Sequence, residues 1–194
     1  MVRRIFRSAA VVLLVVVCLI LLVQSWPVLY SMASLLGGPA LPTPQERVFF
    51  TVDFTLPDVQ GNLVRLFDLR GQPVLINIWA TWCYPCRAEM PSINALYHEY
   101  QTKGLAIVAI AIDEGGKPAV TPFMQAYTLS FRVLLDPQNM LGAQLQMPGI
   151  PTSYLLDKRG RIVYRKDGLH NWHTAAIRDL VDQLLAEEGG GTTP

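Results

Sequence analysis

The sequence contains few cysteines, few histidines and little charge. Among its 194 residues there are three cysteines and three histidines, and 16% of the residues are charged. A structural zinc site usually takes four Cys or His ligands. No second ligand pair accompanies Cys83 and Cys86, since His98, His170 and His173 do not form one. The net charge of +1 at pH 7 gives no basic footprint for nucleic acid, and the sequence shows no internal repeats.

Charge is absent from one long stretch near the N-terminus. No charged residue occurs in residues 8–45, and residues 9–23 are an unbroken run of 15 apolar residues. This run is shorter than the ~20 residues of a usual membrane span, but Trp26 and Tyr30 follow it and suit the far interface. Arginines at positions 3, 4 and 7 place the N-terminus in the cytoplasm. We expect residues 1–36 to form an uncleaved anchor, with the rest of the chain outside the cytoplasm.

Composition divides the remainder of the chain into three parts. Residues 37–47 are rich in proline and glycine, which predicts an extended linker. Residues 48–186 contain alternating apolar and polar segments and are predicted to form one folded domain. Residues 187–194 read EEGGGTTP and are expected to be a flexible tail.

A strand, a helix and a second strand are predicted in the middle of the chain. Two apolar runs rich in β-branched residues are typical of strands buried on both faces of a parallel sheet, Val74–Ala80 and Leu105–Asp113. Between them, Ala88–Tyr100 has apolar residues at helical spacing, and Pro91 is expected to kink this helix rather than end it. This order predicts a right-handed βαβ unit.

The flanking segments complete one α/β domain. An antiparallel hairpin is predicted around the turn Lys158–Gly160. Four more segments are assigned, a strand pair in Val48–Leu69, a helix in Pro118–Tyr127, a strand in Phe131–Asp136 and a helix in Thr174–Ala186. The predicted fold is a mixed central sheet flanked by helices, preceded by a strand-pair extension and the N-terminal transmembrane helix.

Cys83 and Cys86 lie two residues apart, between the first buried strand and the helix. A structural disulfide here would close a loop of only four residues and stabilise the fold little. At a helix start, free N–H groups and the helix dipole favour a thiolate on Cys83. Cys86, one turn later, can then attack a mixed disulfide formed on Cys83. We interpret the pair as a redox-active dithiol, with Cys83 as the exposed attacker and Cys86 as the buried resolver.

Two motifs resemble those of the thioredoxin superfamily. The first is IWATWCYPC at residues 78–86, and the second is GIPT at residues 149–152, which resembles the loop whose proline is cis in that family. The segments RAEMPSI, LLDP and LLDKRGRIVYR are similar to the membrane-anchored thiol–disulfide oxidoreductases of the TlpA/ResA type. The resemblance implies a thioredoxin-like fold in which Pro151 is cis and faces the dithiol. It also implies that Ile150 pairs its backbone with a substrate strand.

Three neighbours of the cysteines are predicted to shape the site. The resemblance implies that Trp82 flanks the dithiol, although an aromatic residue at this position could equally belong to the core. Tyr84 and Pro85 form the dipeptide between the cysteines, and proline is tolerated in a first helical turn. Strong oxidants of the family carry a histidine in this dipeptide, so its absence here favours a reductase.

Two acids are candidates for proton transfer. Cytoplasmic thioredoxins carry a buried aspartate before the motif, where this chain has Asn77. Glu89 follows Cys86 by three residues on the same side of the helix, and the reductase branch of the family has a glutamate at this place. The alternative is a solvated helix glutamate. Glu114 matches a second family acid just beyond the second strand, although acids at strand ends are usually solvated.

These features predict an extracytoplasmic thiol–disulfide oxidoreductase of a bacterial inner membrane. It would reduce disulfides in client proteins, for example in cytochrome c maturation or copper-site assembly, and a membrane thiol–electron donor would recharge it. We expect a monomer with no metal and no cofactor beyond the disulfide. A disulfide oxidase or isomerase stays open, as does a copper-binding assembly factor using His170 or His173. A peroxidase is disfavoured because no Thr-x-x-Cys pattern occurs.

Overall fold

The computed structural model describes residues 41–188 of the chain. The membrane anchor predicted in residues 1–36 lies outside the described residues, as do residues 37–40 of the predicted linker and residues 189–194 of the predicted tail. Within residues 41–188, no helix is both long enough and apolar enough to cross a membrane.

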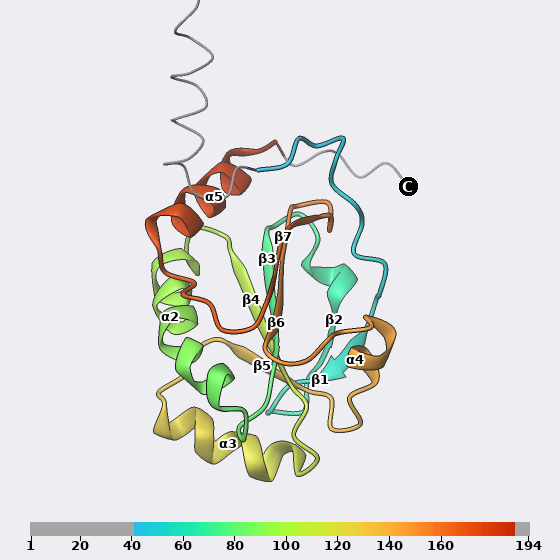
Figure 1. The fold of residues 1–194 in the computed structure, drawn as a ribbon, viewed down its shortest axis with the longest axis vertical. Helices are drawn as coiled ribbons and strands as arrows, with labels where there is room; N and C mark the ends of the chain where they lie inside the picture. The colour runs from blue at the N-terminus through green and yellow to red at the C-terminus, as the bar shows by residue number, and fades with distance from the viewer. Residues whose placement is uncertain (1–40, 189–194) are drawn as a thin grey trace, which may run out of the picture. The chain divides into compact units, whose positions relative to one another are not determined.

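A five-stranded mixed sheet forms the centre of the domain (Figure 1). The strand order is β5-β4-β3-β6-β7. The central strand β3 pairs in parallel with β4 and antiparallel with β6, while β4–β5 is parallel and β6–β7 is antiparallel. The bounds are β3 (Val74–Trp79), β4 (Ala106–Ala111), β5 (Arg132–Leu135), β6 (Thr152–Leu156) and β7 (Ile162–Asp167). The predicted strands and hairpin are confirmed, and β3 is buried at every position, as its apolar run predicts.

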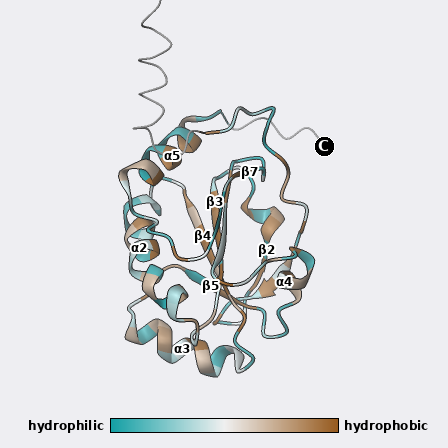
Figure 2. Ribbon diagram, viewed as in Figure 1, coloured by the Kyte–Doolittle hydropathy of each residue, from teal (hydrophilic) through white to brown (hydrophobic). Residues whose placement is uncertain are grey.

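The three longer helices pack on one face of the sheet. They are α2 (Tyr84–Tyr100), α3 (Gly116–Ala126) and α5 (Ala175–Ala186). Their apolar residues join one core with Leu75 and Trp79 of β3, to which α2 contributes Met90, Ile93 and Leu96. Helix α2 begins at Tyr84, earlier than the predicted Ala88, and continues through Pro91 as predicted. In Figure 2 the hydrophobic colour is concentrated on the central strands, whereas the helices carry both hydrophobic and hydrophilic colours.

The opposite face of the sheet is covered by shorter elements. The predicted strand pair is present as β1 (Thr55–Pro57) and β2 (Leu63–Arg65), which pair antiparallel, and the 3₁₀ helix η1 (Leu66–Leu69) follows. The short helix α4 (Met140–Gln144) was not predicted, because its five residues are too few to show a helical pattern. The side chain of Asp136 accepts hydrogen bonds from the N–H groups of Met140 and Leu141, which fixes the start of α4.

A buried ion cluster joins the two ends of the described chain. The Arg47 guanidinium contacts Asp157 at 3.1 Å and Glu187 at 2.6 Å, and the Arg47 and Asp157 side chains are only 2% and 1% exposed. The Arg161 guanidinium also forms an ion pair with the Asp157 carboxylate at 2.7 Å. Arg47 of the predicted linker and Glu187 of the predicted tail therefore both bind the folded domain. Leu156 pairs with Val74, so this cluster lies at the end of the sheet where β3 begins, remote from Cys83.

Candidate active site

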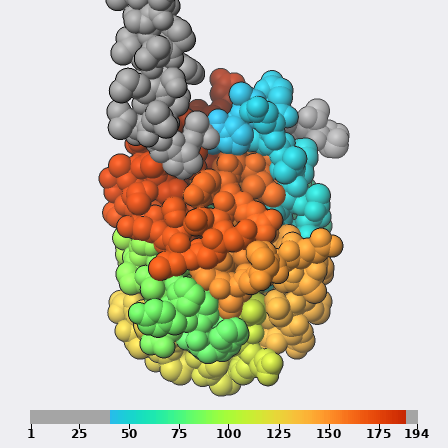
Figure 3. Space-filling view, viewed as in Figure 1, coloured from blue at the N-terminus to red at the C-terminus, as the bar shows by residue number. Residues whose placement is uncertain are grey.

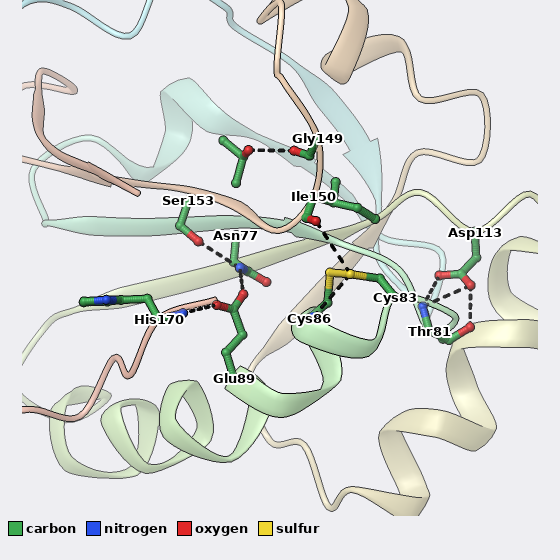
Figure 4. Close-up of a disulfide and its surroundings, with 11 residues drawn as sticks. Asn77, Thr81, Cys83, Cys86, Glu89, Asp113, Gly149, Ile150, Ser153 and His170 are labelled. Carbon is green, nitrogen blue, oxygen red and sulfur yellow. Dashed lines mark hydrogen bonds between the residues drawn. A yellow bond between two sulfur atoms is a disulfide. The ribbon is translucent and has the colours of Figure 1, made fainter. Parts of the chain in front are cut away.

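The turn between β3 and α2 holds the two cysteines. Cys83 has extended backbone geometry and caps α2, and its sulfur accepts a hydrogen bond from the N–H of Cys86 at 3.2 Å. The two sulfurs form a disulfide with an S–S distance of 2.07 Å (Figure 4). Pro85 falls in the first turn of α2, where its missing N–H would have no helical partner. Free N–H groups and the helix dipole at this end favour a thiolate on Cys83 in the reduced state.

A carboxylate from a neighbouring strand end fixes the segment that leads into Cys83. Asp113 follows β4 and is only 3% exposed. Its oxygens accept the Thr81 N–H at 3.1 Å and the Thr81 hydroxyl at 2.5 Å. Glu114, the predicted site acid, is exposed and forms no hydrogen bond within residues 41–188. The structure therefore places its neighbour Asp113, and not Glu114, against the redox turn.

The second motif meets the disulfide from the loop that leads into β6. The Ile150–Pro151 peptide bond is cis, as the resemblance implied. The Ile150 carbonyl oxygen lies 3.8 Å from the Cys83 sulfur, and the Thr152 hydroxyl donates to the Gly149 carbonyl at 2.7 Å, which steadies the turn (Figure 4). In residues 41–188, neither the N–H nor the carbonyl of Ile150 pairs with another backbone group. A strand of another protein could bond there.

Aromatic residues near the disulfide divide between core and surface. Trp79 is fully buried, whereas Trp82 is 67% exposed and Tyr84 is 80% exposed. Trp82 is thus not a core residue, and both exposed residues are sequence neighbours of Cys83. Cys86 is fully buried as predicted, but Cys83 is only 6% exposed, which corrects the expectation of an exposed attacker. In the oxidised state its sulfur is turned toward Cys86 and the Ile150 carbonyl.

Glu89 is fully buried on the same helix as Cys86 and is held by groups from two other segments. One oxygen accepts from the Asn77 amide at 2.7 Å, and the other accepts from the His170 N–H at 3.2 Å (Figure 4). The Asn77 amide also donates to the Ser153 hydroxyl at 2.9 Å. Burial raises the pKa of Glu89 to about 7, against the hydrogen bonds from Asn77 and His170, which lower it. Glu89 is therefore not a solvated helix residue, and near neutral pH it can gain or lose a proton.

Sequence reasoning found Glu89 but missed His170, whose N–H donates to its carboxylate, and Ser153, whose hydroxyl accepts from the Asn77 amide beside it. Both are distant in the sequence, and their contacts require β6 beside β3 and a loop that returns over α2. The register of β3 with β6, which pairs Asn77 with Ser153, would have found one of them. No group of three or more His, Cys, Asp or Glu residues in residues 41–188 is arranged to hold a metal ion.

Comparison with known proteins agrees with this geometry. Residues 51–165 match the model of the AhpC/TSA family. The chain belongs to the AhpC/TSA family. A thiol-disulfide oxidoreductase ResA of Bacillus cereus is 40% identical to this AhpC/TSA chain over 111 residues, 57% of this chain and 64% of that protein. ResA of Bacillus subtilis (strain 168) is 35% identical over 57% of this chain and 62% of its own length. The match thus spans less than two thirds of these relatives.

Solved structures share the fold of this AhpC/TSA chain. A crystal structure from Chlorobium tepidum, described as a thiol:disulfide interchange protein DsbE, is 28% identical with a TM-score of 0.66, covering 73% of this chain and 99% of that one. StoA from Bacillus subtilis is 24% identical with a TM-score of 0.56, covering 68% of this chain and 95% of that one, and this likeness concerns the fold alone.

Proposed function

We propose that this chain is a thiol–disulfide oxidoreductase that reduces disulfides in client proteins. The observation that carries the proposal is the Cys83–Cys86 disulfide, which lies at the start of α2 against the cis Ile150–Pro151 bond. A helix start lowers a thiol pKa, and Ile150 offers unpaired backbone groups beside the sulfur. The relatives named thiol-disulfide oxidoreductase support the same chemistry.

The reaction is a two-electron exchange in two steps. The Cys83 thiolate attacks one sulfur of a client disulfide, that bond breaks, and the other client sulfur leaves as a thiolate. The Cys86 thiol then loses its proton and attacks the Cys83 sulfur, which breaks the mixed disulfide and releases the second client thiolate. The client gains two electrons, and the chain ends with the disulfide found in the structure.

Glu89 is the acceptor of the Cys86 proton in this scheme. Burial in apolar surroundings raises the pKa of a thiol, and Cys86 is fully buried. Resolution of the mixed disulfide therefore needs a base near the Cys86 sulfur. Glu89 lies one turn further along α2 with a pKa of about 7, which suits a base working near neutral pH. Its oxygens bond to Asn77 and His170 rather than to Cys86 among the described residues, so the proton passes through a water or a small side-chain movement.

The direction of exchange and the setting belong to the same proposal. The Tyr84-Pro85 dipeptide lacks the histidine expected in strong oxidants of the thioredoxin superfamily, which supports reduction over oxidation or isomerisation. The clients would be extracytoplasmic proteins, such as those whose cysteines bind haem or copper. A membrane thiol donor would return the electrons. The apolar run of residues 9–23 supports attachment of the domain to the outer side of the cytoplasmic membrane.

A cysteine trap tests the reaction and the client together. In Cys86→Ser, the mixed disulfide on Cys83 cannot resolve, so covalent complexes with clients should accumulate and be released by reductant. Cys83→Ser is the matched control and should form none. The proposal fails if Cys83→Ser traps clients instead, or if neither variant does in cells that contain the client. A reduction potential below about −220 mV supports a reductase, and one above about −150 mV supports an oxidant.

A further inference from the structure

The loop between β7 and α5 is fastened to the active site by three alternate backbone N–H groups. The Gly168 N–H donates to the Pro151 carbonyl at 2.8 Å. The His170 N–H donates to the Glu89 carboxylate at 3.2 Å, and the Trp172 N–H donates to a serine hydroxyl on α2 at 3.0 Å. One short segment therefore contacts the cis-proline, the buried acid and the redox helix. In Figure 3 this segment, coloured orange to red, lies against the green surface of α2.

The loop has the alternation of an extended strand. The side chains of His170 and Trp172 turn inward, where their rings pack edge-to-face at 5.0 Å and Trp172 is fully buried. Leu169 and Asn171 turn outward and are exposed. Gly168 begins the loop with φ +80°, a conformation that other residues rarely adopt. The inward side chains hold the loop in place, so its N–H groups are presented at fixed positions.

Ser92 is the residue of α2 that receives this loop. Its hydroxyl accepts the Trp172 N–H at 3.0 Å and donates to the backbone carbonyl of Glu89 at 2.7 Å. The same hydroxyl therefore touches the loop on one side and the main chain of the acid on the other. Removing it would free the loop next to His170, whose N–H is one of the two donors to the Glu89 carboxylate.

We infer that Ser92 is a positioning residue for the active-site acid. It holds the loop after β7 against α2 so that the His170 N–H stays directed at the Glu89 carboxylate. The inference rests on the proposed role of Glu89 in proton transfer. It goes further by assigning a second helix residue and a distant loop to that role.

The expected effect follows from which form of Glu89 the loop favours. A backbone N–H stabilises the ionised carboxylate, so loosening it raises the pKa of the acid. The other titratable groups around Glu89 are the two cysteines, which form the disulfide, and the His170 ring, whose pKa is lowered by burial and by Lys166. That shift disfavours the charged imidazole, and a signal of the Glu89 carboxyl reports the protonation of Glu89 itself.

The test is a direct titration of Glu89 in the oxidised full-length chain. Selective ¹³C labelling of glutamate side chains gives the signal, which Glu89→Gln identifies by its loss. Ser92→Ala should raise the titration midpoint by about half to one pH unit, a three- to tenfold change in proton affinity, as expected for one weakened hydrogen bond to a carboxylate. Ser92→Thr keeps the hydroxyl and should keep the parent midpoint.

Asn171→Ala is the control for general loosening of the loop. Its side chain accepts the His173 N–H at 3.0 Å but faces away from Glu89, so the midpoint should not move. The inference is overturned if Ser92→Ala leaves the midpoint unchanged, or if Asn171→Ala shifts it equally. The role of Glu89 itself is judged separately, because Glu89→Gln should slow disulfide exchange about 10- to 100-fold near neutral pH. An unchanged rate would refute that role but leave the Ser92 result decisive.

Discussion

Glu89 keeps an acidic side chain in a place where its charge is costly. The residue has no exposed surface, and the two hydrogen bonds to its oxygens only partly replace water. Neutral glutamine would fill the same space without this cost. The retained acid is therefore best explained by its chemistry, because a group with a pKa of about 7 changes its protonation readily in the range where cells work.

Glu89→Gln should change how stability depends on pH. The folded pKa of about 7 lies above the ordinary 4.5, so between these values the folded chain holds a proton that the unfolded chain has released. The contribution of Glu89 to stability is thus full below about pH 4.5 and is lost as the pH rises through about 7. Equilibrium denaturation of the oxidised protein should show that the free energy of unfolding of the variant rises relative to that of the parent as the pH increases over this range. The rise should be at most about 3 kcal/mol.

A second glutamate supplies the control of opposite sign. The hydrogen bond from His173 lowers the pKa of Glu99, so its contribution is present at higher pH and is lost as the pH falls. The free energy of unfolding of Glu99→Gln should therefore fall relative to that of the parent as the pH rises from acid values. If the two variants follow parallel curves, the buried environment of Glu89 does not control its titration.

At the scale of elements, the redox turn depends on a bond from outside its own segment. β3 and α2 bring the cysteines together. Thr81 lies in the turn between this strand and this helix, and Asp113 at the end of β4 accepts its hydrogen bonds. Parallel neighbours end at the same edge of the sheet, so a side chain after β4 naturally reaches the turn after β3. The position of Cys83 is thus set by two strands and not by the Cys-x-x-Cys spacing alone.

Thr81→Val should weaken this fastening without changing the shape of the side chain. The substitution removes the hydroxyl that bonds Asp113 and leaves a buried carboxylate with one donor fewer. The free energy of unfolding should fall by about 1–3 kcal/mol, measured by urea denaturation of the oxidised protein. Thr81→Ser retains the hydroxyl and should stay close to the parent. Equal midpoints for valine and serine would show that the bond contributes nothing.

The sequence predicted the elements whose causes are local. The apolar run of β3 and the helical spacing after it place Cys83 and Cys86 at a strand-to-helix turn. The cis Pro151 could be predicted only through the resemblance of its motif, because X-Pro bonds are mostly trans. The contacts of Ser153 and of the loop after β7 were missed, because they form only when segments far apart in the chain pack together. Glu114 was predicted by analogy with a family acid, and the structure shows it exposed, whereas its neighbour Asp113 is buried and bonds Thr81.

For the whole molecule, the buried cluster around Arg47 closes the domain. Arg47 enters from the linker side, Glu187 from the end of α5, and both meet next to Asp157 at the turn between β6 and β7. Removing one partner of a buried ion pair leaves an uncompensated charge, which costs more than losing a pair on the surface. The end of the predicted linker is therefore bound to the folded domain through Arg47.

Arg47→Ala should destabilise the domain by about 3 kcal/mol, at the lower end of the range for a broken buried pair, because Arg161 still contacts Asp157. Arg65→Ala is the matched control, since its pair with Asp53 is about half exposed. That control should cost at most about 1 kcal/mol. Thermal or urea unfolding of the two variants measures the difference, and equal losses would mean that burial of the Arg47 pair has no energetic weight.

The Arg47–Glu187 contact also determines where the domain can be attached to a surface or to another protein. Because these side chains touch at 2.6 Å, the described chain enters and leaves its domain at one pole, at the opposite end of the sheet from the cysteine turn (Figure 1). A surface or a fusion partner joined to either end of the described chain would therefore be attached at the same end of the domain. In both cases the cysteine turn and the cis-proline turn would lie at the opposite end of the sheet from the support, so the choice of attached end leaves access to the disulfide unchanged.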